Sequence, residues 1–323
     1  MKNAKCFLGT VLMASLFFIG CGKSDDGDML VETPPTAQEF AKLQSDALED
    51  LTQQFQFEAE DGSTTFTSEK GVNITINGSC LKLDGNPVSG SVDVAFVELF
   101  DKGHMLVTNK PTMGVLPNGN KKLLISGGEF YIRATQDGEP LDNDCDIILT
   151  VPSDLTGGSD PDMVLWNGTI DDDGNLTWEE DPANATGQGG VFVEGGQYYA
   201  FLSDFGWSNI DRFYNDPRPK TTIYVQAPTG YDYTNSNIYL SYDGENTGLA
   251  ALDTYEDGLF SEHYGEIPIG LECHVIFISE DNGNWKYAIK PVTIAADEII
   301  TFSLAETAVA TEAQLTDLIN DLP

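Results

Sequence analysis

Positive charge is scarce in this sequence. Only 16 lysines and arginines accompany 52 aspartates and glutamates, which gives a formal net charge of -36 at pH 7. A surface of this sign repels phosphate backbones and anionic lipid headgroups, so nucleic acid and acidic membrane surfaces are excluded as partners. Because salt screens the repulsion among like charges, the composition suits a saline or cation-rich environment.

Recognisable reactive motifs are also lacking. The chain has three histidines, and no segment matches a nucleophile elbow, a zinc-protease helix, a paired CxxC set, a phosphate loop or a dinucleotide loop. Triads and carboxylate pairs can still assemble from distant residues. The favoured interpretation is a non-enzymatic protein, and the alternative is an envelope hydrolase that acts on glycans through acidic residues between its modules.

Only one long apolar run is present, at residues 6–19, and it follows two lysines. A charged start and an apolar run too short to span a bilayer are typical of a signal peptide. The run ends in Phe-Ile-Gly followed by Cys21, which resembles the lipobox of bacterial lipoproteins, whose cysteine becomes lipid-modified. We therefore expect a signal peptide at residues 1–20 and a membrane anchor through lipid on Cys21.

Small and acidic residues follow Cys21 and cannot pack, so residues 21–35 are predicted to be a solvated tether. The run Gly-Lys-Ser-Asp-Asp-Gly-Asp at 22–28 resembles the surface-export signal of Bacteroidetes-type lipoproteins. That resemblance implies an outer-membrane protein exposed at the cell surface. A plain tether that faces the periplasm is the alternative.

Cysteine is rare beyond the anchor. Cys80, Cys145 and Cys273 are an odd number, and exported proteins can keep disulfides. Cys80 and Cys145 could pair within one module, but three buried free thiols are the favoured interpretation.

The hydrophobic pattern predicts a mainly β fold: two tandem antiparallel β-sandwich modules with a short N-terminal amphipathic helix and a short C-terminal helix. Thr36 and Glu39 form a capping-box pattern before apolar residues at helical spacing. From residue 54 the period changes to two, and turn pairs such as Asp84-Gly85 and Asp137-Gly138 separate the strands. The helix and first sandwich are assigned to 36–152.

Glycines and prolines at 152–162 indicate a boundary. A β-rich connector at 153–218 is expected to follow, then a second sandwich, immunoglobulin-like or transthyretin-like, at 219–305. A C-terminal helix is expected at 306–323, where Thr311 and Gln314 repeat the capping-box pattern.

Three segments carry a resemblance: Gly-Val-Asn-Ile-Thr-Ile from Gly71, Gly-Asn-Pro-Val-Ser-Gly-Ser-Val-Asp-Val-Ala-Phe-Val-Glu-Leu from Gly85, and Ser-Gly-Gly-Glu-Phe-Tyr-Ile-Arg-Ala from Ser126. Together they resemble the β-sandwich domain of netrin-receptor and zonula-occludens proteins, over about residues 54–152. The resemblance implies a fold and a scaffolding or adhesion role, without catalytic residues. The connector and second module resemble stretches of other Bacteroidetes-type lipoproteins.

Two clusters are candidate metal sites. Glu272 and His274 lie two apart on a predicted strand and so share a face, where His263 could join them. A polar loop beside a hydrogen-bonded strand histidine is the alternative.

The second cluster is Asp171, Asp173 and Asn175, which resembles part of a calcium loop. It lacks the glutamate of an EF-hand, because the twelfth position is Pro182. A hairpin turn is the simpler interpretation, and calcium is the one cofactor considered.

Aromatic residues are the remaining candidates. The four tryptophans could form platforms for sugars, although aromatic residues in sandwiches usually belong to the core. In the connector, Trp207, Arg212, Tyr214 and Arg218 are candidate binding residues. The favoured role of the two arginines is to clamp modules through fork-shaped ion pairs. The predicted function is a membrane-anchored binding, adhesion or scaffold module, with a polysaccharide or an envelope protein as partner.

Overall fold

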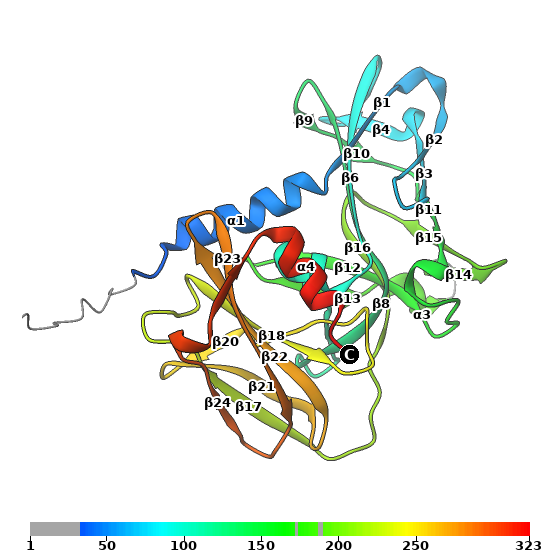
Figure 1. The fold of residues 1–323 in the computed structure, drawn as a ribbon. Helices are drawn as coiled ribbons and strands as arrows, with labels where there is room; N and C mark the ends of the chain where they lie inside the picture. Colours follow the sequence, from blue (N-terminus) through cyan, green and yellow to red (C-terminus); the bar gives the residue numbers. More distant parts are fainter. Residues whose placement is uncertain (1–32, 172–173, 187–189) are drawn as a thin grey trace, which may run out of the picture. The chain divides into compact units, whose positions relative to one another are not determined.

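Short strands dominate this protein, which is described here as a computed structural model (Figure 1). The structure describes residues 33–171, 174–186 and 190–323. Strands take up 51% of the described residues and helices 16%, which confirms the mainly β prediction. The α-helices of the described ranges are α1 (Ala37–Asp50), α2 (Lys102–Val107), α3 (Pro182–Thr186) and α4 (Glu312–Asn320), and the 3-10 helices are η1 (Ala59–Asp61), η2 (Gly78–Cys80), η3 (Ser153–Thr156) and η4 (Leu304–Glu306).

Three sheets are built from the strands before residue 214. The largest has the path β1 (Gln53–Glu58), β6 (Ser91–Leu99), β8 (Lys121–Gln136), β16 (Gly206–Phe213), β12 (Val164–Ile170), β13 (Leu176–Glu180), β7 (Met113–Val115), with β9 (Glu139–Pro140) beside β8. The second has the order β14 (Gly190–Glu194), β15 (Gln197–Leu202), β11 (Ile147–Pro152), β3 (Asn73–Asn77), β2 (Ser63–Thr67). The third has the order β10 (Asp142–Asn143), β4 (Leu81–Leu83), β5 (Asn86–Pro87).

Alternation of apolar and polar residues explains why these segments are strands. In β3, Ile74 and Ile76 are fully buried while their neighbours are half-buried. A strand puts alternate side chains on opposite faces, so this pattern gives the sheet one core face. The turns Asp84-Gly85 and Asp137-Gly138 have positive φ at both residues, as the predicted two-residue hairpins require.

The predicted boundary after Pro152 does not separate two sets of sheets. β15 pairs with β11 along its whole length, and β16 pairs with both β8 and β12. Residues 164–213 therefore complete the sheets begun by residues 53–152, instead of forming a connector. The boundary was misplaced because glycines and prolines mark any surface loop, here the one that contains η3.

Two pairings depart from the predicted antiparallel arrangement. β13 pairs with β7 in parallel through Trp178 and Gly114, and β17 pairs with β24 in parallel. Since β7 also pairs with β8, the strands β8, β16, β12, β13 and β7 close into a circuit.

Two further sheets follow residue 219. One has the order β20 (Thr254–Glu256), β21 (Leu259–Pro268), β17 (Lys220–Gln226), β24 (Ile299–Thr301). The other has the order β19 (Ala250–Ala251), β18 (Ser236–Tyr242), β22 (Glu272–Asp281), β23 (Asn284–Thr293), β25 (Ala308–Ala310).

Strand β22 is buried on both faces and therefore has a continuous apolar run instead of alternation. Val275 and Phe277 join one hydrophobic cluster, whereas Ile276 and Ile278 join the other. The first face packs with β17 and β24, and the second is covered by α1 and α4. Burial on both faces is why polar residues are missing from the middle of this strand.

Helix α1 begins at the predicted capping box, in which the Thr36 hydroxyl accepts from the Glu39 amide and the Glu39 carboxylate accepts from the Thr36 amide. Its buried residue Phe40 meets the edge of the Trp285 ring, with ring centroids 6.3 Å apart. The capping box at Thr311 likewise starts α4. The two helices thus cover the β22–β23 face.

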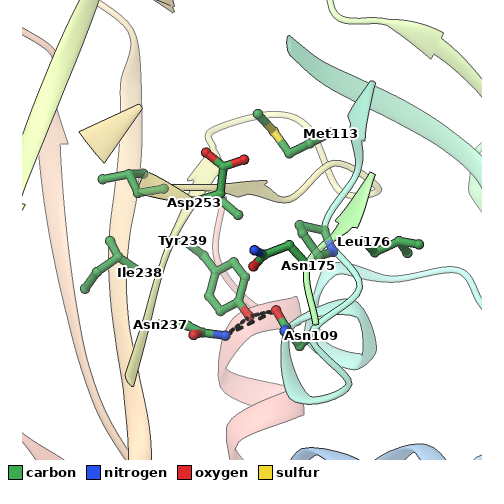
Figure 2. A pocket seen from close by; sticks show the side chains of 11 residues that line it. Asn109, Met113, Asn175, Leu176, Asn237, Ile238, Tyr239 and Asp253 are labelled. Atoms are coloured by element: carbon green, nitrogen blue, oxygen red, sulfur yellow. Dashed lines mark hydrogen bonds between the residues drawn. The ribbon is translucent and has the colours of Figure 1, made fainter. Parts of the chain in front are cut away.

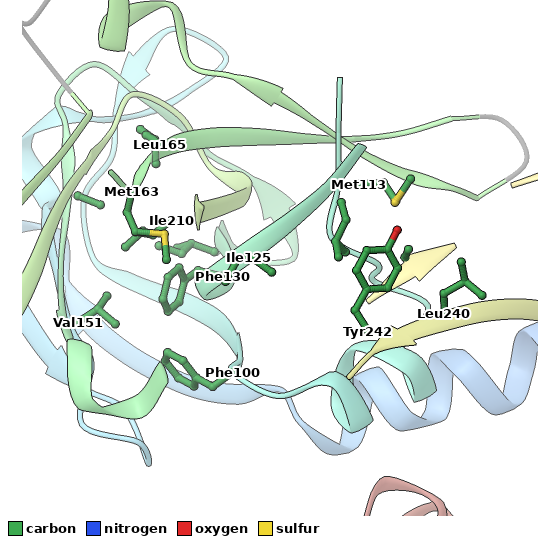
Figure 3. Close-up of a cluster of buried hydrophobic side chains, with 14 of the residues drawn as sticks. Phe100, Met113, Ile125, Phe130, Val151, Met163, Leu165, Ile210, Leu240 and Tyr242 are labelled. Carbon is green, nitrogen blue, oxygen red and sulfur yellow. The ribbon is translucent and has the colours of Figure 1, made fainter. Parts of the chain in front are cut away.

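One hydrophobic cluster extends through both groups of sheets (Figure 3). It includes Phe130 and Leu165 from the strands before residue 214 and Leu240 and Tyr242 from β18. Contacts divide the chain at residue 33, and residues 34–323 form one unit.

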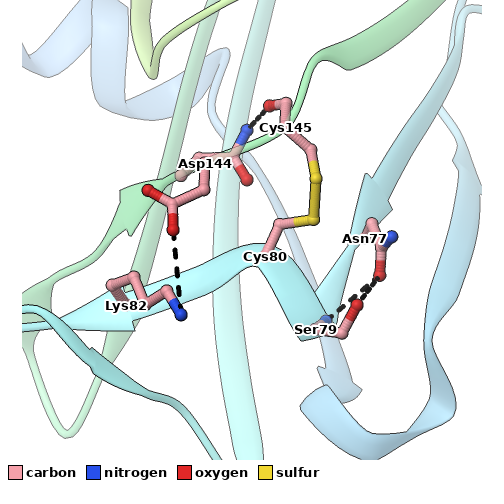
Figure 4. The surroundings of a disulfide bond; sticks show 7 residues. Asn77, Ser79, Cys80, Lys82, Asp144 and Cys145 are labelled. Carbon is pink, nitrogen blue, oxygen red and sulfur yellow. Dashed lines mark hydrogen bonds and ion pairs between the residues drawn. A yellow bond between two sulfur atoms is a disulfide. The ribbon is translucent and has the colours of Figure 1, made fainter.

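A disulfide joins Cys80 to Cys145 across 65 residues of sequence, with Cα atoms 5.7 Å apart (Figure 4). The preferred prediction of three free thiols was therefore wrong, and only Cys273 is free among the described cysteines. The bond ties η2 to the segment that enters β11. By the chain-entropy model, closing a loop of this length stabilises the fold by about 4 kcal/mol.

Across the described ranges, no helix is long and apolar enough to cross a membrane.

Candidate functional site

A cleft with a volume of about 390 Å³ lies where α1, β18 and the hairpin β20–β21 meet. A smaller cavity of about 30 Å³ adjoins it and shares five lining residues (Figure 2). The larger volume is within the usual range for small-molecule sites, about 300–1,000 Å³. The residues that line the larger cavity are Ala37, Phe40, Ala41, Gln44, Asn109, Asn175, Tyr233, Thr234, Asn237, Leu252, Asp253, Thr254, Tyr255 and Phe260.

Neutral amides form the floor of the cleft. The Asn237 amide nitrogen donates to Asn109 Oδ1 at 3.1 Å and to the Tyr239 hydroxyl oxygen at 2.8 Å. The Tyr239 hydroxyl in turn donates to Asn109 Oδ1 at 2.7 Å. In these bonds Asn109 only accepts and Asn237 only donates, which leaves the other half of each amide for further partners. Burial raises the pKa of Tyr239 well above its usual value, so this group stays uncharged.

The end of helix α2 fixes the position of Asn109. The backbone N–H of Asn109 donates to the Leu106 carbonyl, and the backbone N–H of Lys110 donates to the Met105 carbonyl. This is the Schellman arrangement, which needs a left-handed residue after the helix, and Asn109 has φ of 53°. Asparagine tolerates that conformation better than most residues do. Asn109, the residue that ends helix α2, therefore also positions its side-chain amide in the cleft.

Helix α1 supplies the amide of Gln44 on one wall. Ala37, Phe40, Ala41 and Gln44 share one face, because residues three and four apart in a helix are neighbours. The Gln44 Nε2 atom is buried and has no hydrogen-bond partner. An unpaired buried donor is unfavourable by about 1–3 kcal/mol.

Tyrosines form the opposite wall. Tyr233 is 60% exposed, and its ring centroid lies 5.6 Å from that of Tyr255. Tyr255 packs in turn edge-on against Phe260, its partner across the β20–β21 hairpin. Such an exposed aromatic surface in a cleft is a natural contact for the apolar face of a ligand.

The loop that carries Tyr233 is held in place. Gly230 has φ of 94°, and a Cβ atom there would lie 2.6 Å from Pro34 Cγ, so only glycine fits against the segment before α1. Asn235 Nδ2 donates to the Pro35 carbonyl at 3.1 Å. The Asp232 carboxylate accepts from the amide of Thr234. These contacts preorganise the aromatic wall.

Asp253 is the one carboxylate among the described residues that line the cleft. Lys121 Nζ lies 2.6 Å from Asp253 Oδ2, and the Tyr264 hydroxyl donates to the same oxygen at 2.9 Å. Behind this pair, burial raises the pKa of Glu262 to about 7. The Glu262 carboxylate accepts hydrogen bonds from the amides of Gly265 and Glu266.

The predicted histidine cluster is not assembled. His263 Nδ1 pairs with the Thr254 hydroxyl at 2.7 Å, and His274 Nδ1 pairs with Asp243 at 2.8 Å. Glu272 does share a strand with His274, as predicted. Throughout the described part of the chain, no group of three His, Cys, Asp or Glu residues could hold a metal ion. The two histidines have separate hydrogen-bond partners because their strands, β21 and β22, belong to different sheets.

In the described residues of the predicted calcium loop, Asp171 and Asn175 bond each other between the paired strands β12 and β13. Asp171 Oδ1 accepts from the Asn175 amide at 2.8 Å, and the Asp171 amide donates to the Asn175 carbonyl. Asp173 lies outside the described residues. Asn175 itself lines the cleft, a role that its sequence context does not signal.

The four residues predicted to bind in the connector do not form one site. Trp207 is 8% exposed and packs against Tyr131 and Trp178. Arg212 Nε lies 2.6 Å from Asp160 Oδ2, beside a separate open cavity of about 400 Å³. The Tyr214 hydroxyl donates to Asp216.

Arg218 forms a fork-shaped pair, but with a neighbour in its own segment and not across two modules as predicted. Its guanidinium bonds Asp216 Oδ2 through Nε at 2.9 Å and through Nη2 at 2.5 Å. These bonds hold the pKa of Asp216 well below its usual range. Arg218 Nη1 also donates to the Gly270 carbonyl, which ties the segment before β17 to the segment before β22.

All four tryptophans are buried, so the exposed aromatic surface of the cleft comes from tyrosines. The available signal was local: Tyr233 stands among Asp, Thr, Asn and Gly, which are loop residues, whereas each tryptophan stands in a strand.

A second polar group, missed by the sequence analysis, lies inside the largest sheet. We call Glu129, Asp211, Asn209 and Ser126 the buried acid cluster, and all four are 0% exposed. Asn209 Nδ2 donates to Asp211 Oδ2 at 2.6 Å, and Ser126 Oγ donates to Asn209 Oδ1 at 2.8 Å. Glu129 Oε2 and Asp211 Oδ1 have no partner, and burial raises the pKa of both carboxyls well above the usual value.

No protein-family model matches the chain, and no curated protein matches its sequence. The case for function therefore rests on the chain itself.

Proposed function

We propose that this protein is a lipid-anchored binding protein outside the cytoplasm, and that its cleft holds a saccharide chain. The observation that carries the proposal is the pairing of an exposed tyrosine wall with neutral amides, one of which, Gln44 Nε2, is buried without a partner. Aromatic rings offer a face for the apolar side of a sugar, and amides both donate to and accept from hydroxyl groups. Polar groups that converge on a cleft beside aromatic side chains are typical of ligand sites.

Binding is favoured over the alternative of an envelope hydrolase. Hydrolysis of a glycosidic bond usually needs two carboxyl groups that face each other across the substrate. The described lining of the cleft supplies one carboxylate, Asp253, and that group is engaged by Lys121 and Tyr264. Another pair of neighbouring carboxyls, Glu129 and Asp211, is fully buried and out of reach of a glycan.

The location is proposed from the lipobox at Cys21 and the acidic tether. We expect Cys21→Ala to abolish incorporation of a labelled fatty acid and to release the protein from membranes. Protease treatment of intact cells then distinguishes the two leaflets, since a surface protein is cleaved and a periplasm-facing one is protected. Fatty-acid labelling that survives the substitution would contradict the anchor.

We also infer two β-sandwich modules, with revised limits. Residues 53–213 form the sheets of the first module, and residues 220–310 those of the second. Resemblance of residues 54–152 to the sandwich of netrin-receptor and zonula-occludens proteins remains part of this proposal. The shared hydrophobic cluster makes the pair act as one unit, which suits a rigid binding surface.

The binding proposal is tested with the full-length protein in detergent, screened against an oligosaccharide array and then titrated by calorimetry. We expect Tyr233→Ala to weaken glycan binding at least fivefold, because the exposed ring of the cleft is lost. Phe192→Ala is the matched control, since Phe192 is a 52% exposed aromatic residue on the distant edge strand β14. Absence of binding to every glycan, or an equal loss in both variants, would overturn the proposal.

A further inference from the structure

We infer that the cleft selects uncharged saccharides and rejects acidic ones such as uronate or sulfated chains. The inference rests on the proposed function and specifies the class of ligand. Its starting point is the charge of the lining: among the described residues around both cavities there is no lysine or arginine, and the one charged side chain is Asp253. Recognition of a carboxylate or sulfate in proteins ordinarily uses arginine or lysine donors.

The nearest cation is already committed. Lys121 Nζ is 2.6 Å from Asp253 Oδ2, and the two side chains are only 16% and 11% exposed. To bind an anionic sugar, Lys121 would have to leave this pair and expose Asp253 to a second negative charge. Glu262, buried behind the pair with a pKa of about 7, adds a further partial negative charge at neutral pH.

The same arrangement suits neutral sugars. A carboxylate offers about four lone-pair sites, and the contacts of Asp253 with Lys121 and Tyr264 leave it able to accept from a sugar hydroxyl. The amides of Asn109, Asn237 and Gln44 likewise bond hydroxyls without carrying charge. The formal net charge of the whole protein, -36, also repels acidic chains during approach.

The test uses the full-length protein and two sets of hexamers: neutral maltohexaose, cellohexaose, xylohexaose and mannohexaose, and acidic oligogalacturonate and alginate hexamers. We expect at least one neutral hexamer to bind, and every acidic hexamer to bind at least tenfold more weakly at low salt. Added salt should reduce this difference in affinity, because it screens the repulsion between the protein and the acidic hexamers. This measurement needs no variant, so it survives if a substitution fails to fold.

Asp253→Asn should then reduce the ratio of neutral to acidic hexamer affinity at least threefold, since it removes the repulsive charge and frees Lys121. Asp93→Asn is the matched control, because it makes the same change in total charge on β6, where Asp93 bonds Gln56. It should leave the ratio of neutral to acidic hexamer affinity unchanged. An acidic hexamer that binds as tightly as the neutral ones would overturn the charge selectivity while leaving saccharide binding in place. Failure of all hexamers to bind would overturn saccharide binding together with its selectivity.

Discussion

The amide cleft and the buried acid cluster use similar residues for opposite purposes. In each, an asparagine joins side chains from distant segments: Asn237 bonds Asn109 in the cleft, and Asn209 bonds Ser126 in the cluster. The cleft is open to solvent beside an exposed tyrosine, whereas every member of the cluster is 0% exposed. Solvent access, more than residue type, therefore separates the proposed binding site from the structural network.

The two regions also differ in their titratable groups. The floor of the cleft is made of amides and hydroxyls that stay neutral at any physiological pH. The cluster holds two carboxyls whose pKa values burial raises, and each has one oxygen without a partner. Substitutions in the cluster should therefore change stability, and substitutions in the cleft should change binding.

The largest effect is expected in the cluster. Asn209→Ala should lower the free energy of unfolding by about 3–5 kcal/mol, because it leaves a buried carboxyl and the Ser126 hydroxyl without their shared partner. Urea denaturation measures the change. Asn237→Ala, the equivalent substitution in the cleft, should lower it by about 1 kcal/mol at most. Equal losses in the two variants would remove the distinction between the regions.

The next effect concerns pH and Glu262, a buried acid that adjoins the cleft through Asp253. Its folded-state pKa is raised from 4.5 to about 7. The folded state thus holds this proton more tightly, so the contribution to stability is complete below pH 4.5 and is lost as pH rises towards 7. The loss is at most on the order of 3 kcal/mol.

Glu262→Gln cannot lose a proton and should remove that part of the pH dependence. Unfolding free energies of the two proteins are measured at pH 5 and pH 8. Relative to the wild-type protein, the variant should have a higher free energy of unfolding at pH 8 than at pH 5. An identical pH profile in both proteins would refute the assignment.

A smaller effect is expected on binding. Asn237→Ala should weaken the affinity for a neutral oligosaccharide about five- to tenfold, which corresponds to one hydrogen bond of about 1 kcal/mol. Calorimetry gives the dissociation constant. Asn86→Ala, at an exposed asparagine of β5 whose side chain bonds only the nearby Asp84 carbonyl among its described contacts, is the control. A control variant that weakens binding equally would argue against the cleft.

The smallest effect concerns one atom, Gln44 Nε2, whose removal should raise stability and weaken binding. Gln44→Met keeps the length of the side chain and removes the unpartnered Nε2 donor. It should stabilise the fold by up to about 1 kcal/mol and weaken saccharide binding a few-fold, because a buried donor without a partner is unfavourable until a ligand accepts from it. A variant that loses stability and keeps full affinity would show that Gln44 has a structural role only.

Local features of the fold were predictable from the sequence. The capping boxes at Thr36 and Thr311 are present, and so are the left-handed turns at Asp84 and Asp137. Each depends on interactions within about four residues, so it can be recognised before the tertiary structure is known. The alternating burial in β3 was predictable for the same reason.

Non-local features were mispredicted or missed. The Cys80–Cys145 bond needs β11 to run beside β3, which spacing along the chain does not reveal. Trp207 was taken as a binding candidate although β8 and its neighbours bury it. The predicted boundary at 152 failed because strand pairing, and not loop composition, decides which segments share a sheet.

The sequence by itself determined the acidic charge, the mainly β character and the capping boxes that start α1 and α4, because these depend on composition or on neighbouring residues. The predicted helix at 306–323 begins only at Glu312, since Ala308–Ala310 pairs with β23 as strand β25. The tertiary structure alone decided that Gln44, Asn109, Asn175 and Asn237, from four separate segments, line one cleft, and that Asn209 lies sealed beside two carboxyls. The physical reason is that an amide is equally polar in both places. Only packing decides whether water and a ligand can reach it.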